Sequence, residues 1–539
     1  MDFERNRVMK TALKNQHYER GTPRDDSPAG NGGGSAAGSF QQALKSVPIA
    51  VLCFAASSCM VGPNYVRPNA PAPPAFKEPP PSNFKEAAGW KQGQPLDDMN
   101  RGKWWEVFKD RQLDALEDQV ATANQTLAAA EAAYRGSRAQ IKVSRSQLYP
   151  TLSGGGTVVG TGSSGTSNPN FHFPATQYAL MTMPTATASW VPDLWGQVRR
   201  TIENNVDIAQ AQAANLANTR LSLQSALALD YFQLRGLDAQ KQLLDTTTEA
   251  YQKALQLTVN RFNQGVASQV DVAQAQTQLA QTQAQSTDTQ VARQQFEHAI
   301  AILIGRPPAE FSIPFSPENP TPPPIPGMLP SALLERRPDI ATNERMVAAA
   351  NAEVGVNYAA YYPNITLSAD AGLESASLAS LFTWPSRFWS LGPSLSELIL
   401  DFGRRRGQIE VSQASYDQAV ANYRETVLTA FQQVEDQLAA LRILEQEAEQ
   451  QSAAVTYAEK SLQLANYQYT GGIANYLQVI SAQEIALANE VTAVQLKTRR
   501  MTAAVSLIEA LGGGWDTSQL PTRKQVTPQN PRKVEKVSP

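Results

Sequence analysis

One repeated spacing constrains this chain more than any other feature of its sequence. Three pairs of glycines, each pair in similar local sequence, lie 207 positions apart: Gly196 and Gly403, Gly265 and Gly472, and Gly305 and Gly512. The dipeptide Tyr149-Pro150 recurs as Tyr362-Pro363 at an offset of 213. Equal offsets of this kind indicate an internal duplication, with one copy in residues 105–305 and the other in residues 331–515.

The segments outside the two copies are rich in proline or in polar residues, and such segments disfavour regular helices. Residues 59–104 form a proline-rich N-terminal strap, which we expect to run extended over a surface. Residues 306–330 contain ten prolines and form an irregular connector between the copies. Residues 516–539 are expected to be an extended tail, and residues 1–58 a disordered extension that ends in a lipoprotein signal peptide.

The signal is read from a short apolar run, residues 47–56, which Lys45 precedes and Ser57-Ser58-Cys59 follows. A basic residue, a short apolar core and small residues before a cleavage point are typical of a secretory signal. The small residues before Cys59 resemble a bacterial lipobox, in which the cysteine is acylated and becomes the mature N-terminus. Residue 60 is Met and not the Asp that keeps bacterial lipoproteins at the inner membrane, so the resemblance implies sorting to the outer membrane. The alternative is an apolar segment beside an inert cysteine.

Within each copy the same order of elements is predicted. A helix-rich stretch ends at the Tyr-Pro dipeptide, two strand-like segments follow, and a very long helix begins after the first glycine of the repeat. A glycine-containing turn then leads to a second helix. The helical stretches are 111–148, 197–262 and 268–304 in the first copy, and 338–361, 404–470 and 475–511 in the second.

The strand-like segments are short and have alternating apolar residues. Residues 365–373 alternate with period two, residues 178–190 alternate less regularly, and residues 152–161 are diluted by glycine. Four strands are too few to close a membrane barrel, which needs about eight, and an open edge is not tolerated in lipid. If the strands span a membrane, several copies must share one barrel. A small β-domain outside the membrane is the alternative.

The long helices carry a coiled-coil pattern with an unusual composition around it. Seven apolar residues are spaced by three, four or seven positions: Leu216, Leu223, Leu227, Leu234, Leu237, Leu244 and Tyr251. Ten glutamines lie within residues 269–295, interleaved with Ala, Thr and Ser. This composition is compatible with an ordinary solvated coiled coil or with a helical tube that is wet on two faces.

The charge balance and the scarcity of reactive side chains exclude several function classes. The chain has 46 basic and 49 acidic residues, so no overall field favours nucleic acid. It contains three His and two Cys, too few and too scattered for a zinc site. No Walker A, HExxH or GxSxG sequence occurs. We therefore expect no enzyme activity, no catalytic residues, no cofactor and no bound metal.

Several sequence signatures identify a family when they are taken together and in order. They are Cys59 with Gly62-Pro63-Asn64-Tyr65, Trp104-Trp105, Asp193-Leu194-Trp195-Gly196, Gly305-Arg306-Pro307, Arg336-Arg337-Pro338-Asp339 and Gly512-Gly513-Gly514-Trp515. With the duplication, the chain resembles the TolC-like outer-membrane efflux channels, in particular their NodT- or OprM-like lipoprotein branch. The resemblance covers about residues 59–515.

The resemblance implies a mainly α-helical fold with a membrane β-barrel portion. Each protomer would contribute four β-strands and long antiparallel coiled-coil helices of an α-barrel, and a homotrimer would form a twelve-stranded barrel in outer-membrane lipid. It implies a passive exit duct for small molecules in a Gram-negative envelope, working with a periplasmic adaptor and an inner-membrane transporter of the resistance-nodulation-division (RND) class. The alternatives are a channel for type I protein secretion or a periplasmic coiled-coil scaffold without a pore.

The resemblance also implies which residues work at the periplasmic end. Adaptor-docking tips match Gly265, Val266, Ala267 and Ser268 in the first copy, and Gly472, Ile473, Ala474 and Asn475 in the second. A periplasmic gate matches Asp271, Tyr469 and Leu477, although Asp271 is equally explained as a helix-start acid that the helix dipole favours. Gln478 and Ser481 stand where the family often has Asp, so we expect weaker cation binding and a seal that depends more on Leu477.

Overall fold

The computed structural model describes residues 60–70, 72–78, 103–162, 177–318, 322–323 and 330–528. All of them belong to the second of two units of the chain, Ser58–Pro539. The predicted extension, signal peptide and acylated Cys59 lie outside the described residues.

The two copies contain the same series of elements, which confirms the duplicated fold. The first contains α2 (Arg111–Ala123), α3 (Gln125–Ser146), β1 (Thr151–Gly162), β2 (Gln177–Trp190), α4 (Gln197–Asn263) and α5 (Gln269–Leu303). The second contains α6 (Pro330–Arg336), α7 (Pro338–Ala359), β3 (Asn364–Ser375), β4 (Arg387–Ser396), α9 (Arg404–Thr470) and α10 (Tyr476–Ala510). Short helices complete the described chain: η2 (Trp104–Phe108), η3 (Pro308–Glu310), α8 (Leu378–Leu381), η4 (Trp384–Ser386), η5 (Thr517–Gln519) and α11 (Arg523–Val526).

The glycines that reveal the duplication are all in the left-handed backbone region, where a residue with a Cβ is strained. Gly196 and Gly403 precede the long helices with φ of 83° and 92°, and Gly265 and Gly472 form the hairpin turns with φ of 76°. Gly305 and Gly512 end the second helices, and a Cβ at either would overlap a backbone carbonyl, that of Ala123 or Arg336. The equal offsets therefore mark equal backbone requirements.

In each copy the helical segment before the first strand is interrupted, so that a short helix (α2 or α6) precedes a longer one (α3 or α7). Asn124 separates α2 from α3; its side-chain oxygen accepts from Leu127 N, and its Nδ2 donates to Leu303 O at 2.8 Å. At the corresponding break in the second copy, Arg337 Nη1 donates to Ala510 O at 3.0 Å. The first break was not predicted from the sequence, because Asn124 lies in a continuous helical pattern. In both copies, the side chain at the interruption thus binds a backbone carbonyl at the C-terminal end of α5 or α10.

The four strands form one antiparallel sheet in the order β1-β2-β3-β4. Thr151 pairs with Ser189, and their counterparts at the repeat offsets, Asn364 and Ser396, pair in the same way, so the β1-β2 and β3-β4 hairpins have the same strand register. The middle pairing of Trp190 with Leu367 joins one copy to the other. The three predicted strand segments are confirmed.

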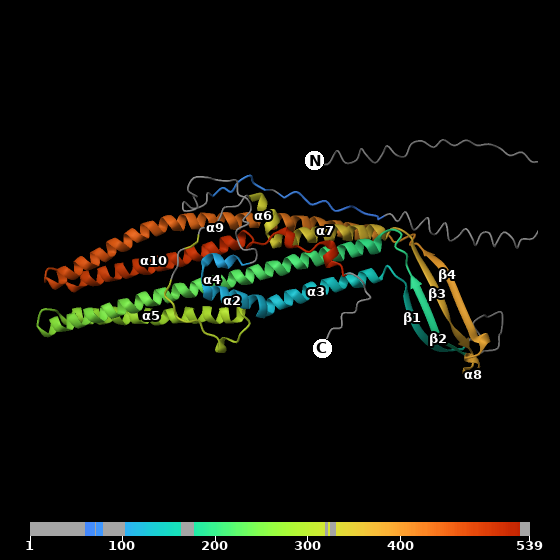
Figure 1. Cartoon of the computed structure of the whole chain (residues 1–539), viewed down its shortest axis with the longest axis horizontal. Helices are drawn as coiled ribbons and strands as arrows, with labels where there is room; N and C mark the ends of the chain where they lie inside the picture. The colour runs from blue at the N-terminus through green and yellow to red at the C-terminus, as the bar shows by residue number, and fades with distance from the viewer. Residues whose placement is uncertain are drawn as a thin grey trace, which may run out of the picture. The chain divides into compact units, whose positions relative to one another are not determined.

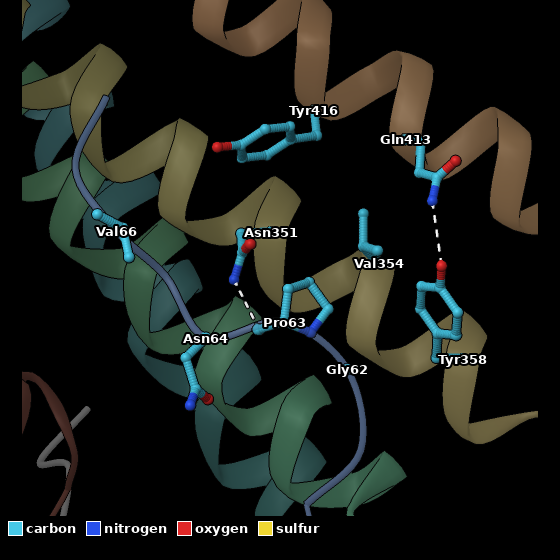
Figure 2. Close-up of a pocket in the computed structure, with 9 residues that line it drawn as sticks. All are labelled: Gly62, Pro63, Asn64, Val66, Asn351, Val354, Tyr358, Gln413 and Tyr416. Atoms are coloured by element: carbon cyan, nitrogen blue, oxygen red, sulfur yellow. Dashed lines mark hydrogen bonds between the residues drawn. The ribbon is translucent and has the colours of Figure 1, made fainter. Parts of the chain in front are cut away.

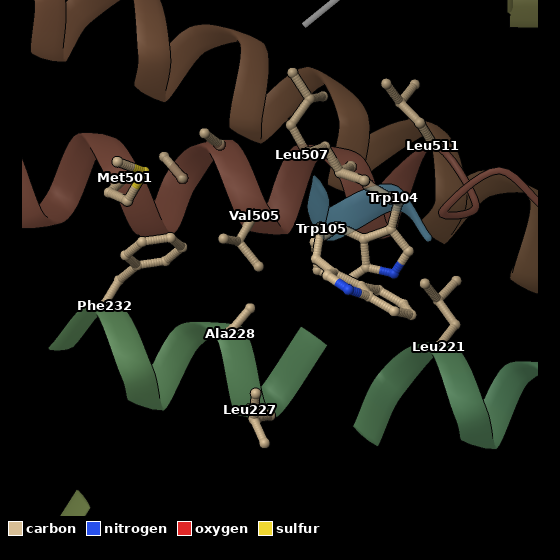
Figure 3. Close-up of a cluster of buried hydrophobic side chains, with 14 of the residues drawn as sticks. Trp104, Trp105, Leu221, Leu227, Ala228, Phe232, Met501, Val505, Leu507 and Leu511 are labelled. Atoms are coloured by element: carbon tan, nitrogen blue, oxygen red, sulfur yellow. The ribbon is translucent and has the colours of Figure 1, made fainter. Parts of the chain in front are cut away.

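Helices α4 and α9 each contain 67 residues. Each runs from the sheet to the turn that joins it to the next helix, α5 or α10, at the other end of the described chain (Figure 1). At about 1.5 Å per residue, each is roughly 100 Å long. The main core fills the space among them; Trp104 and Trp105 insert between Leu221 on α4 and Leu511 at the end of α10 (Figure 3). Of the seven predicted seam residues, Leu227, Leu234, Leu244 and Tyr251 are buried, and the other three are half-buried. Among the described helices, none combines the length and apolar character that crossing a bilayer requires.

The two ends of the described chain differ from one another. Residues 60–70 have no regular secondary structure, and Pro63 O accepts from Asn351 Nδ2 of α7 at 3.1 Å (Figure 2). The C-terminal segment departs from the extended tail that we expected, because it contains η5 and α11. Val526 of α11 is fully buried against Ile141 and Val206, so apolar burial stabilises this turn of helix.

Candidate functional site at the hairpin tips

The tip of the first hairpin, between α4 and α5, is a compact turn built on one glycine. Gly265 N donates to Phe262 O at 2.8 Å, and Val266 N donates to Arg261 O at 2.9 Å. These bonds satisfy the last carbonyls of α4, as helix-terminating glycines commonly allow. The backbone geometry leaves the Val266 side chain exposed at the apex.

The second tip, between α9 and α10, repeats this arrangement. Gly472 N donates to Tyr469 O at 3.1 Å, and Ile473 N donates to Gln468 O at 2.9 Å. Ile473 is 83% exposed, at the position equivalent to Val266. Both tips therefore present an exposed β-branched apolar side chain on a hydrogen-bonded turn.

The helices that leave the tips begin with different caps. Ser268 and Asp271 form a capping box: Asp271 N donates to Ser268 Oγ at 3.2 Å, and Ser268 N donates to Asp271 Oδ2 at 2.9 Å. In the second hairpin, Asn475 Oδ1 accepts from Gln478 N at 3.2 Å. The Asp271 carboxylate thus has a structural role at the start of α5, which agrees with the helix-start alternative.

The predicted gate residue Tyr469 lies in a small cluster between the two hairpins. Its ring is 5.1 Å from that of Tyr476, and Ala275, one turn after Asp271, packs into the same cluster. The Arg261 guanidinium lies 4.7 Å from the centre of the Tyr469 ring and donates to Thr470 O at 3.2 Å. Burial raises the pKa of Tyr476 above its ordinary value, and the nearby Tyr469 and Asp271 add to this rise.

The three predicted gate residues are therefore in different surroundings. Tyr469 is 6% exposed, and its hydroxyl has no hydrogen-bond partner among the described residues. Leu477 is 54% exposed and is not among the residues that pack into that cluster. Sequence reasoning missed Arg261, which links the two tips. It also missed Val270, which is exposed like Leu477 and lies 207 positions before it, so the repeat offset alone could have identified it.

Elsewhere, the described surface contains an open groove of about 600 Å³ between the strap, α7 and α9 (Figure 2). Pro63 and Val66 of the strap line one side, and Tyr358 and Tyr416 line the other. Gln413 Nε2 of α9 donates to Tyr358 Oη of α7 at 3.2 Å. Within the described part of the chain, no group of three or more His, Cys, Asp or Glu residues is placed to hold a metal ion.

Comparison with known proteins gives consistent relatives over most of the chain. The family profile described as "Outer membrane efflux protein" matches residues 116–306 and 329–513. Outer membrane protein OprJ of Pseudomonas aeruginosa is 30% identical over 480 residues, which cover 86% of this chain and 95% of OprJ. The probable efflux pump outer membrane protein TtgC of Pseudomonas putida is 27% identical over 497 residues, covering 90% and 98%. A solved structure of the outer-membrane channel OprN superposes with a TM-score of 0.74 at 26% identity, covering 85% of this chain and 100% of OprN.

Proposed function

The chain belongs to the outer membrane efflux protein family, and from this membership we propose that it is the exit duct of a tripartite efflux pump. It conducts small molecules passively to the exterior, and a periplasmic adaptor and an inner-membrane RND transporter supply them. The observation that carries the proposal is the family match over both copies of the duplicated fold. TtgC is named for efflux and OprJ as an outer membrane protein, and neither name refers to a chemical reaction, which supports a duct that catalyses none.

The working form that we propose is a homotrimer whose twelve strands form one barrel. The described sheet has four strands, and β1 and β4 are at its edges. Unpaired strand edges are not tolerated in lipid, so strands from other copies must cover them. Exposed apolar residues on β4, among them Trp389, Leu391 and Leu395, suit a surface that faces lipid. Acylation of Cys59 would add a lipid anchor directly before the described strap; palmitate labelling of the wild-type chain and of Cys59→Ser tests it.

The hairpin tips are the proposed docking site for the adaptor, through Gly265, Val266, Ala267 and Ser268 and through Gly472, Ile473, Ala474 and Asn475. Support comes from the exposed apolar side chains at both apices, which can be buried against a partner at little cost. A charged residue at the same position would lose its hydration on docking, which is unfavourable. We expect Ile473→Asp to abolish drug resistance in a complemented deletion strain, without changing conductance in planar bilayers. Val66→Asp, a matched change at an exposed valine on the strap, should retain resistance. Full resistance with Ile473→Asp would contradict docking at the tips.

The proposed gate consists of Asp271, Tyr469 and Leu477, with a seal that depends mainly on Leu477. Gln478 and Ser481 add no carboxylate in the second hairpin, so divalent cations should block conductance weakly. Leu477→Ala should raise the open probability of single channels, and Asp271→Asn should remove the remaining cation block. Ser268→Ala is the control, because it removes a capping bond without changing charge. Equal loss of block in both variants would assign Asp271 to helix capping alone.

Conductance also tests the function as a whole. A folded, assembled protein that gives no channels in planar bilayers would contradict the duct and favour the scaffold without a pore.

A further inference from the structure

A groove in the first copy, between α3 and α4, holds the last described segment of the chain. Val526 of α11 is fully buried in it. The side chains that pack around Val526 come from both helices: Ile141 of α3, and Ile202, Val206 and Ala209 of α4. One apolar residue that follows the second copy in sequence thus completes an apolar cluster of the first.

Polar contacts from α3 hold the backbone of the same segment. Arg138 Nε donates to Val526 O at 3.3 Å, and Arg145 Nη1 donates to Pro528 O at 3.5 Å. The segment is therefore bound by one buried valine and by two carbonyl groups that accept from α3. We call this groove and its contacts the α11 site.

The repeat offsets locate the equivalent site in the second copy. The offset of 213 relates α3 to α7, and the offset of 207 relates α4 to α9. Five residues of the α11 site have these counterparts: Asn351 for Arg138, Val354 for Ile141, Tyr358 for Arg145, Gln413 for Val206 and Tyr416 for Ala209. All five counterparts line the open groove of about 600 Å³ between the strap, α7 and α9, which we call the strap groove (Figure 2). The site that Val526 fills in the first copy is thus an open groove in the second.

The N-terminal strap fills only part of the strap groove. Pro63 O accepts from Asn351 Nδ2 at 3.1 Å, so the strap uses the donor that corresponds to Arg138. Gln413 is exposed and Tyr416 is half-buried, although their counterparts on α4 are both buried. Tyr358 Oη accepts from Gln413 Nε2, and its own O–H group can donate to a carbonyl as Arg145 does in the first copy. The remaining space thus offers apolar surface and one hydrogen-bond donor.

The sequence after Pro528 repeats the features of the segment bound at the α11 site. An Arg-Lys pair at 523–524 is followed by Val526-Thr527-Pro528, and a second Arg-Lys pair at 532–533 is followed by Val537-Ser538-Pro539. Residues 529–539 lie outside the described part of the chain. Asn530-Pro531 separates the two sequences, and this dipeptide favours a turn. A second valine with similar neighbours therefore follows the one that is bound.

The tail is long enough to reach the strap groove of its own chain. Helix α3 packs on α4, α4 on α7, and α7 on α9. Because packed helices are about 8–10 Å apart, the groove between α7 and α9 lies roughly 20–25 Å from Arg145 on α3. The chain from Pro528 to Val537 spans up to about 30 Å when it is extended. The turn at Asn530-Pro531 would direct it back across α4 and α7.

The charges of the tail also suit this groove. At the α11 site, Arg523 Nη1 forms an ion pair with Glu203 of α4 at 3.3 Å. The counterpart of Glu203 is Glu410 on α9, which pairs with Arg406 at 3.2 Å with side chains that are 64% and 81% exposed. Exposed pairs of this kind contribute little, so Glu410 can accept a second basic partner. Lys536, next to Val537, supplies one.

We propose that Val537 binds in the strap groove of its own chain, at the site equivalent to that of Val526. Val537 packs against Val354 and the Tyr416 ring, and Lys536 pairs with Glu410. The tail then covers the open side of the N-terminal strap, so that each copy of the duplicated fold is closed by a terminal segment. All of these contacts lie within one chain, and the inference does not depend on the proposed function.

A disulfide within one chain tests this contact in the full protein in membranes. Under mild oxidation, Val537→Cys/Gln413→Cys should form a bond that protects both thiols from a maleimide and leaves the chain at monomer size on denaturing, non-reducing gels. Val537→Cys/Tyr457→Cys is the matched control, because Tyr457 is exposed on the same helix but about 66 Å from Gln413. Each single variant should keep its new thiol reactive, which excludes a bond to Cys53 or Cys59.

The labelling rate of Gln413→Cys measures how fully the tail covers the groove. A chain that ends after Pro528 keeps α11, and its Gln413→Cys thiol should react with a bulky maleimide about tenfold faster than in the full chain, the factor expected from burial of one valine side chain. Val537→Asp in the full chain should give a similar increase. Ser538→Ala, which removes no apolar surface, should keep the slow rate, and labelling of Tyr457→Cys should stay the same in every chain.

The outcomes decide between the tail and other occupants of the groove. If Val537→Cys/Gln413→Cys forms no bond, or if truncation leaves the labelling rate of Gln413→Cys unchanged, the tail does not bind in the strap groove and the proposal is overturned. A disulfide that joins two chains would also overturn it, because the groove would then hold the tail of another copy.

Discussion

The most demanding stability prediction concerns Asp238, a fully buried carboxylate on α4 that holds the connector against the first hairpin. Its Oδ2 accepts from Arg235 Nη1 at 2.9 Å and from Ser316 N of the connector at 3.1 Å. Its Oδ1 accepts from Arg293 Nε of α5 at 2.6 Å. Arg293 Nη2 in turn donates to Ile313 O at 2.8 Å. One acid therefore pairs with two arginines and holds residues 311–318 of the connector, which have no regular secondary structure.

Asp238→Asn removes the charge while keeping the shape. Breaking a buried ion pair by removing one partner costs about 3–5 kcal/mol, because the remaining charge stays desolvated. Arg235 and Arg293 keep carbonyl partners at Pro314 and Ile313, so we expect local opening of the connector and not global unfolding. Since each 1.4 kcal/mol is about tenfold in an equilibrium constant, opening becomes roughly a hundred- to several-thousandfold more frequent.

Hydrogen exchange at the Ile313 amide measures this opening. Ile313 N donates to Glu297 Oε1 at 3.1 Å, an acceptor that the substitution leaves unchanged, so faster exchange reports opening and not a lost acceptor. Glu447→Gln is the control, because its ion pair with Arg499 is exposed and such pairs contribute at most about 1 kcal/mol. Unchanged exchange at Ile313 in Asp238→Asn would refute the reasoning that this acid anchors the connector.

Two further predictions concern buried positions on α2 and α4. Glu117 is fully buried without a hydrogen-bond partner among the described residues, and burial raises its pKa well above the ordinary value, with Asp114 and Asp118 adding to the rise. The protonated form of Glu117 stabilises the fold fully below the unfolded pKa of about 4.3, and this stabilisation is lost as pH rises through the folded pKa. Glu117→Gln should therefore melt at the same temperature as the wild type in acid and at a higher temperature at alkaline pH. Equal melting temperatures of the two proteins at both pH values would contradict this. A Cβ at Gly236 would overlap the Thr498 side chain, so Gly236→Ala should cost about 1–3 kcal/mol, and Thr498→Ala in the same chain should restore part of it in thermal melts; an undiminished loss in the double variant would point to another cause.

Much of the fold could be predicted because the duplication checks each assignment twice. The offset of 207 places Gly265 and Gly472 at equivalent turns, and both have φ of 76°. A helix boundary supported by a glycine in each copy is much less ambiguous than one that rests on local propensity. The long helices α4 and α9 were therefore predicted to within a residue at both ends.

The elements that escaped prediction lack such a second copy or depend on distant contacts. The break at Asn124 depends on its bond to Leu303 O, 179 positions away in the sequence. Residues of β4 such as Gly392 and Pro393 disfavour strands, yet Pro393 pairs with Leu367 because the sheet supplies a partner strand. The turn of helix at α11 exists because Val526 is buried against α3 and α4. Tertiary contacts override local preference in all three cases.

The candidate site shows the same division between backbone and surroundings. The tip turns follow from glycine and from the capping residues Ser268 and Asn475, so their positions could be read from the sequence. The burial of Tyr469 could not, because it depends on Arg261 and Tyr476, which come from different hairpins. An aromatic residue near a turn is compatible with either an exposed or a buried ring until its neighbours are known.

The duplication explains why side-chain type alone is a poor guide to burial in this chain. Each copy has two lateral faces, and a chain of two copies can cover only the pair of faces where the copies meet. Ala352 on α7 lies at that junction and is buried, whereas its counterpart Ala139 on α3 has the same side chain and is exposed. Selection for packing acts on both positions alike if a second copy covers α3. In the proposed homotrimer, an exposed alanine whose repeat counterpart is buried is a candidate interface residue, and Ala139 on α3 is one example.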